Sequence, residues 1–137
     1  MDYNKLISVT GMSGLFELVS SKSDGALVRS LEDGITKFAS NRVHNFSQIE
    51  NIEIYTTREN VNLVEIFKAM ESSSDALPNE KDAKVVKDYF KNIFPNMDFD
   101  RVYDSDRKKM VKWFKIIKEH KIEIKLSEAP EEQEEAK

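Results

Sequence analysis

The sequence contains no cysteine, which excludes disulfides, thiolate catalysis and cysteine-ligated zinc or iron–sulfur sites. No apolar run approaches the roughly 18 residues that a membrane-spanning helix requires. The first residues also lack the basic and apolar stretches of a signal peptide. We therefore expect a cytoplasmic protein that needs neither a membrane nor a cofactor.

Glycine and proline are scarce, with four and three residues, and all four glycines precede residue 35. They separate short β-branched or alternating runs, which predict strands at 5–10, 15–20, 26–31, 35–39 and, further on, 52–56. Asp33-Gly34 between two such runs favours a tight hairpin, because both residues tolerate positive φ. We expect an α+β protein that begins with a small antiparallel β module. An SH3-like barrel is the preferred form because closure removes exposed strand edges, and an open meander is the alternative.

The apolar pattern changes to helical spacing after residue 60. It predicts helices over 61–70, 80–94 and 106–120, with Asn60 as the N-cap of the first and Asp104 or Ser105 as the cap of the third. Pro95 ends the second helix. The predicted domains are a β module with a terminal helix at 1–72, a linker at 73–80, a helical module at 81–126 and a disordered acidic tail at 127–137.

Charge is unevenly distributed along the chain, although the net charge is only −4. Five glutamates lie in 127–137, whereas the third predicted helix carries Arg107, Lys108, Lys109, Lys112 and Lys115. Lys108, Lys112 and Lys115 share one face and Lys109 flanks it. With Arg107, this ridge is a candidate surface for phosphate or for an acidic protein, and a solvated helix face is the simpler interpretation. The acidic tail could pair with the ridge in the same molecule.

Two loops contain residue types that are found in binding sites. Gly11 and Gly14 have the spacing of the loop that clamps a nucleic-acid backbone in KH domains. That loop joins helices and this one joins predicted strands, so we interpret it as a turn. The loop 96–106 is rich in Asp, as calcium loops are, but Arg101 and Arg107 occupy the positions where an EF-hand needs Gly and Glu.

Neither histidine has the neighbours that a metal site or a catalytic triad requires. His44 and His120 lie in different predicted modules, without a helically spaced carboxylate or second histidine. No serine lies in a nucleophile-elbow sequence. We therefore predict no metal ligands, no catalytic residues and no enzymatic activity.

Two segments carry a resemblance to a known family. The first is 5–31, KLISVTGMSGLFELVSSKSDGALVRSL. The second contains Phe94-Pro95-Asn96, Asp98, Asp100-Arg101-Val102-Tyr103, Ser105-Asp106, Lys109 and Trp113-Phe114. In these segments the chain resembles a family of small uncharacterised bacterial proteins, found chiefly in Bacteroidota and known as a domain of unknown function. The resemblance implies a β-rich first half, a helical second half and a bacterial cytoplasmic setting, without catalytic residues to carry over.

Arg101, Tyr103 and Trp113 in the second segment have a structural interpretation. We expect the loop before the third helix to act as a clasp, with its aromatic residues packed between two helices and Arg101 paired with a carboxylate. Trp113 lies on the apolar helical face and is expected to anchor the core. On this hypothesis, Tyr103→Ala unfolds the helical half.

The leading functional prediction is a non-enzymatic interaction or adaptor module with a protein partner, for example an accessory factor of the transcription or translation machinery. It depends on the absence of an active-site constellation and on analogy with small β modules. One alternative is direct nucleic-acid binding through the basic ridge. The other is a small-ligand binder or an enzyme with an unrecognised site, which requires a pocket lined by titratable groups with shifted pKa values.

Overall fold

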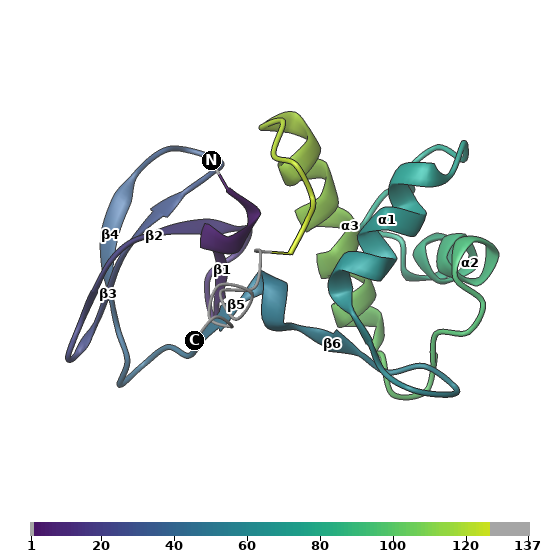
Figure 1. Cartoon of the computed structure of the whole chain (residues 1–137), viewed down its shortest axis with the longest axis horizontal. Helices are drawn as coiled ribbons and strands as arrows, with labels where there is room; N and C mark the ends of the chain where they lie inside the picture. The colour runs from purple at the N-terminus through teal and green to yellow at the C-terminus, as the bar shows by residue number, and fades with distance from the viewer. Residues whose placement is uncertain (1, 127–137) are drawn as a thin grey trace, which may run out of the picture.

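A computed structural model of the chain describes residues 2–126, and within them strands precede helices (Figure 1). The strands are β1 (Leu6–Val9), β2 (Phe16–Lys22), β3 (Gly25–Ser30), β4 (Thr36–Ser40), β5 (Phe46–Gln48), β6 (Glu53–Ile54) and β7 (Val61–Asn62). The helices are α1 (Leu63–Ser72), α2 (Ala83–Ile93) and α3 (Asp104–Glu119), and the 3-10 helices are η1 (Tyr3–Lys5) and η2 (Ile49–Asn51). The predicted α+β class is confirmed.

The first five strands form one antiparallel sheet in the order β4-β3-β2-β1-β5. Thus β1 to β4 form a meander, and β5 returns to pair with the free edge of β1, with Val9 opposite Phe46. The sheet is not closed, so the predicted SH3-like barrel is wrong and the open meander describes the sheet better. The physical reason is local to β5: it is three residues long, and the chain then turns into η2 toward the helices instead of bridging to β4.

The two faces of the sheet pack against different neighbours. Side chains alternate along β1, so that Leu6 joins a core shared with the helices while Ile7 joins a smaller core within the sheet. Ile7 and Phe46 line one cavity together with Leu18 and Ala26, which shows that the sheet curls over its second face. Curling buries this face without closing the sheet.

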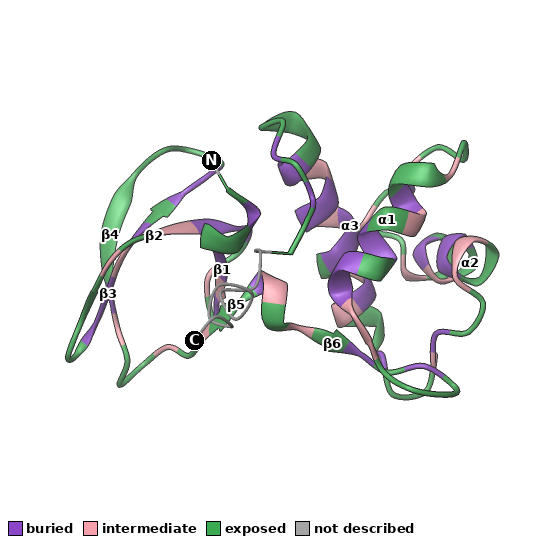
Figure 2. Ribbon diagram, viewed as in Figure 1, coloured by how far each residue is buried: buried purple, intermediate pink, exposed green. Residues whose placement is uncertain are grey.

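The larger core joins both halves of the molecule. It combines Leu6, Leu15 and Ile49 from the sheet side with the inward faces of all three helices. Figure 2 shows buried stretches, in purple, on each of the three helices. Phe67 of α1 contacts the Phe114 ring of α3, with 5.9 Å between the ring centroids. The helices therefore pack against the end of the sheet at β1 and η2.

A short hairpin leads from the sheet into α1. β6 pairs with β7, and Asn62 then caps α1 by accepting the Val64 N–H at 2.9 Å. The predicted cap Asn60 is therefore wrong by two residues, because Val61, expected in the helix, belongs to β7. The strand expected over 52–56 is confirmed only for β6.

The remaining helices begin close to their predicted positions. Asp82 caps α2 through the Val85 N–H, and the helix ends before Pro95. At the start of α3, the Asp106 carboxylate accepts the Tyr103 N–H at 3.0 Å, so the expected caps Asp104 and Ser105 lie inside the helix. None of the helices in residues 2–126 is long and apolar enough to cross a membrane.

After α3 the chain runs back along the molecule as an extended segment. Ile122 and Ile124 are buried in the shared core, whereas Lys125 and Leu126 are exposed. In Figure 1 this yellow segment returns from the tip of α3 to the junction between the sheet and the helices. The predicted acidic tail at 127–137 lies outside the described residues.

Candidate functional site

A groove lies between the loop from Gly11 to Gly14 and α3, where the two halves of the molecule meet. This loop–helix groove has a volume of about 410 Å³. Pockets at such junctions are common binding sites, because side chains from separate elements converge there. Its lining includes Ser8, Thr10 and Ser13 from the sheet half and Lys109, Lys112 and Trp113 from α3.

The loop has its shape because of its two glycines. Gly11 and Gly14 have φ angles of +82° and +88°, a region that favours residues without a Cβ. A Cβ on Gly14 would also come within 2.3 Å of the Glu32 Oε1 atom. The Met12 N–H donates to the Val9 carbonyl at 3.0 Å and closes the turn. The interpretation of this sequence as a glycine-assisted turn between strands is confirmed.

Lys112 ties the loop to α3. Its Nζ donates to the Ser13 hydroxyl at 2.5 Å and lies 3.9 Å from a carboxylate oxygen of Glu32. Lys109 is exposed, and no carboxylate of residues 2–126 forms an ion pair with it. The groove thus holds one ammonium that is partly neutralised and one that is free to meet an anion.

Trp113 gives the groove an apolar base. It is 8% exposed, which confirms its predicted place in the core. A neighbouring cavity of about 340 Å³ shares Ser8, Lys109 and Trp113 with the groove and extends toward β6. There the Arg101 guanidinium lies over the Tyr55 ring, 4.4 Å from its centroid. Indole, phenol and guanidinium groups therefore border this cavity, together with apolar side chains such as Ile54 and Met110 and the carboxylates of Glu53 and Asp106.

The predicted basic ridge does not survive as a single exposed surface. Arg107 is only 2% exposed, so it cannot take part in surface binding. Lys115 donates to the Glu80 carboxylate at 2.8 Å and to the Pro78 carbonyl at 3.0 Å. Lys108 is half-buried and has no ion pair with a described residue, and Lys112 belongs to the groove. Only part of the ridge remains available to a ligand.

Arg107 instead performs the structural role that we predicted for Tyr103. Its guanidinium donates to the Val102 carbonyl, to the Asp104 carboxylate and, at 3.5 Å, to the Phe99 carbonyl, and so it fixes the loop before α3. Tyr103 is 65% exposed, so the prediction that it packs between helices is wrong. The reason is that Tyr103 immediately precedes α3 and points outside its apolar face.

Arg101 fulfils the other half of the clasp hypothesis. Its Nε donates to the Asp98 carboxylate at 2.9 Å, which confirms the predicted pairing with a carboxylate. Its Nη2 also reaches the Thr56 carbonyl at 3.4 Å. Arg101 therefore links the loop before α3 to the chain that follows β6.

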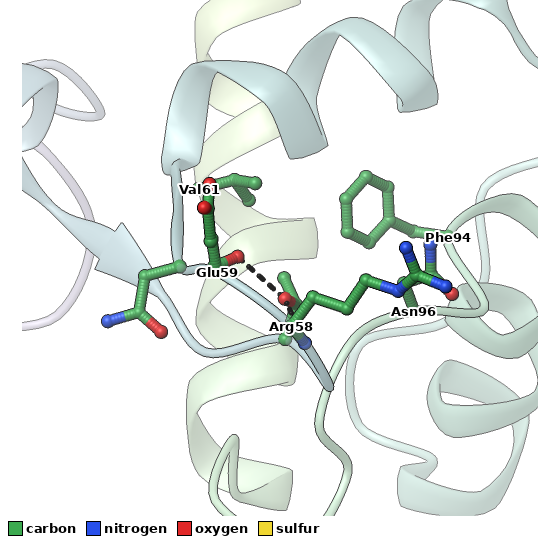
Figure 3. A pocket seen from close by; sticks show the side chains of 7 residues that line it. Arg58, Glu59, Val61, Phe94 and Asn96 are labelled. Carbon is green, nitrogen blue, oxygen red and sulfur yellow. Dashed lines mark hydrogen bonds between the residues drawn. The ribbon is translucent and has the colours of Figure 1, made fainter.

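A separate pocket of about 470 Å³ lies between the β6–β7 hairpin and the end of α2 (Figure 3). Arg58 extends from the hairpin toward Phe94 and Asn96. The Thr56 hydroxyl donates to the Glu59 carbonyl at 2.6 Å, which stabilises the turn of the hairpin. This pocket offers one cation beside an aromatic ring, whereas the loop–helix groove combines two amines, several hydroxyl groups and an indole.

Shifted pKa values occur at groups outside the loop–helix groove. The hydrogen bond from Arg101 lowers the pKa of Asp98, and the hydrogen bond from Lys115 lowers that of Glu80. Burial raises the pKa of two phenols, Tyr3 and Tyr89. Across the part of the chain that the structure describes, no group of three His, Asp or Glu side chains is arranged to hold a metal ion.

Sequence reasoning identified Lys112 as a candidate and Lys109 as its neighbour, but it did not connect them with Ser13 or Glu32. The hydroxyl and carboxylate come from turns about 80 to 100 positions earlier in the chain, and only the fold brings them to α3. The Gly11–Gly14 spacing was the available signal, because it marks a loop with an unusual backbone.

Comparison with known proteins divides the chain into two parts. Residues 4–48 match a domain of unknown function (DUF5606), and residues 52–117 match a second domain of unknown function (DUF6852). The boundary at 49–51 falls on η2, upstream of the predicted linker at 73–80.

One solved structure resembles almost the whole chain. It is the solution NMR structure of a structural-genomics target from Bacteroides vulgatus, with 27% identity, 92% coverage of both chains and a TM-score of 0.67. No curated protein matches the chain. Two domains of unknown function therefore match the chain in succession, which confirms its resemblance to an uncharacterised bacterial family of the Bacteroidota type.

Proposed function

We propose that this protein is a non-enzymatic interaction module that binds an acidic segment of a partner protein in the loop–helix groove. The proposal rests on one observation: the free amine of Lys109 and the amine of Lys112 line the same groove, beside the indole of Trp113. Hydroxyl groups from the opposite wall can bond the backbone of an extended segment, while the amines attract its carboxylates.

The charge supports a protein ligand over nucleic acid. Residues 1–126 contain equal numbers of acidic and basic residues, so the body of the molecule has no net positive charge. Binding to nucleic acid depends on neutralising several phosphates with Lys and Arg. Here Arg107 is buried, and Lys115 and Lys118 pair with Glu80 and Glu71. Two or three free amines suit a short acidic segment better than a phosphate backbone.

The side chains around the groove also fit a protein interface. Trp, Tyr and Arg dominate the residues that contribute most to protein–protein binding. Trp113, Tyr55 and Arg101 border the groove and the cavity that continues from it. The shifted pKa values have structural causes and lie elsewhere, which favours binding over catalysis. A role beside the transcription or translation machinery stays a prediction.

The test is affinity capture from a lysate of the source organism with three forms of the full-length protein. These are the wild type, the double variant Lys109→Glu/Lys112→Glu and the control Lys68→Glu, which changes an exposed lysine of α1 outside the groove. We expect one protein to be retained by the wild type and the control, lost with the double variant, and displaced by a synthetic acidic peptide.

Retention of the same proteins by the double variant would contradict the proposed site. A labelled single-stranded oligonucleotide, added at low salt, tests the alternative ligand. If it binds the wild type more tightly than the acidic peptide does, and the double variant loses it, the groove is a nucleic-acid site instead.

A further inference from the structure

We infer that the acidic C-terminal segment, residues 127–137, is an intramolecular occupant of the loop–helix groove and competes there with the external partner. The inference depends on the proposed function, because it assigns the same groove to an acidic ligand. It adds a regulatory element: the protein carries its own competitor, and a partner must displace it.

The first argument is charge complementarity. The segment 127–137 contains five glutamates and one lysine, so the entire net charge of −4 resides in it. The groove contains an unpaired amine at Lys109 and a second amine at Lys112. Both lysines project from α3 into the groove lining, which contains no carboxylate, although Glu32 lies 3.9 Å from the Lys112 amine.

The second argument is reach. The described chain ends at Leu126, two residues after Ile124, which is buried in the core shared by both halves. Figure 1 shows this end at the junction between the sheet and the helices, the same junction that contains the groove. Eleven residues span up to about 36 Å when extended, which is about the diameter of a domain of this size. The segment can therefore reach Lys109 and Lys112 without any change in the fold.

The third argument concerns concentration. A binding segment that is covalently attached close to its site has an effective concentration there on the order of millimolar. Exposed ion pairs contribute little individually, about 0.2–1 kcal/mol each, so a free peptide of this sequence would bind weakly. In the same molecule, however, weak binding is sufficient. With an intrinsic Kd of about 0.1 mM, the tail would reduce the affinity for an external acidic segment by about tenfold.

The test compares two full-length proteins: the wild type and a variant in which the tail glutamates become glutamine (Glu128→Gln, Glu131→Gln, Glu132→Gln, Glu134→Gln and Glu135→Gln). The probe is a fluorescein-labelled peptide with the sequence of residues 127–137, and fluorescence anisotropy measures its Kd. We expect binding to the glutamine variant to be about tenfold tighter than to the wild type. In the glutamine background, Lys109→Glu/Lys112→Glu should abolish binding and Lys68→Glu should leave it unchanged.

A second measurement needs no added ligand. Trp113 is the single tryptophan of the chain, so its indole N–H gives one NMR resonance that reports directly on the groove. We expect this resonance and the amides of Gly11 and Gly14 to shift between the wild type and the glutamine variant, and to converge at high salt.

The inference is overturned if these resonances coincide in the two proteins, or if the peptide binds both with equal affinity. The second result leaves the groove as a site for acidic segments, so it separates failure of this inference from failure of the proposed function. A peptide that binds neither protein overturns the inference as well.

Discussion

The Lys112 ammonium of α3 lies 2.5 Å from the hydroxyl oxygen of Ser13, 99 positions earlier in the chain. This bond connects the two matched domains at the groove and holds the loop from Gly11 to Gly14 against the helix. A basic residue that the sequence suggests as part of a solvated ridge thus has a structural role as well. Its partner Ser13 places the proposed binding groove at the junction between the two halves.

Gly14 should be required for the conformation of the loop that carries Ser13. Gly14→Ala forces a Cβ into a left-handed backbone and against the Glu32 carboxylate, so we expect a loss of about 1–2 kcal/mol in the free energy of unfolding. Gly34→Ala is the matched control, because Gly34 has φ +74° but open space around it. Urea denaturation should show a smaller loss for Gly34→Ala, and equal losses would mean that Glu32 moves away at no cost.

Arg107 should contribute more to stability than any other charged side chain of α3. Arg107→Met removes bonds to the Val102 and Phe99 carbonyls and leaves them without a donor, so we expect unfolding to become easier by about 2–4 kcal/mol. Tyr103→Ala, at an exposed neighbour, should change stability by no more than about 0.5 kcal/mol. The reverse order in thermal unfolding would restore the clasp role first expected of Tyr103.

The buried phenol of Tyr3 offers a stabilising substitution. Its hydroxyl is buried and has no hydrogen-bond partner among the described residues. Tyr3→Phe removes this unsatisfied group, and we expect stability at pH 7 to be unchanged or to rise by up to about 1 kcal/mol.

The buried phenol of Tyr3 also makes the stability of the fold depend on pH at alkaline values. Burial raises the pKa of Tyr3 in the folded state above its ordinary value of about 10. The unfolded state therefore releases its proton first as the pH rises, and folding stability falls above pH 10. Tyr3→Phe should remove part of this fall, as measured by urea denaturation between pH 9 and pH 11. Identical slopes for the two proteins would contradict the burial of the hydroxyl.

The ion pair of Glu80 with Lys115 should make the fold less stable at acidic pH. The hydrogen bond from Lys115 lowers the pKa of Glu80 below its ordinary value of 4.5. A lowered pKa stabilises the fold above the ordinary value, and this contribution disappears as the pH falls through the folded-state pKa. We expect Glu80→Gln to be less stable than the wild type at pH 7 and equal to it once the pH lies below the folded-state pKa of Glu80. A constant difference across this range would show that the ion pair is not the cause.

Local patterns predicted the elements of the fold well, whereas pairings between distant segments were not predictable. Alternating runs between glycines identify β1 to β4, because a hairpin depends on residues close in sequence. β5 was missed because three residues give no pattern, and its stability comes from pairing with β1 about 40 positions earlier. The choice between a barrel and an open sheet depends on the same long-range pairing, and for this reason the prediction of a barrel was wrong.

For the candidate site, too, local patterns were predictable from the sequence and contacts between distant segments were not. Helical spacing identifies the basic and apolar faces of α3, and Trp113 lies in the core as expected. Which lysines remain free depends on partners outside the helix, such as Glu80 for Lys115. Arg107 looked like a surface cation because arginine is seldom buried, and only the carbonyls of the preceding loop explain its position.

The shared core has a consequence for how this protein is inherited. Leu6 and Leu15 are 0% exposed in the core that the first matched domain shares with the helices, and each contributes about 1.5–3 kcal/mol by its burial. A gene fragment that encoded only the first matched domain would produce a sheet with this aliphatic face in water. Recombination that separated the two domains would therefore be selected against, and we expect genomes to keep them adjacent in one reading frame.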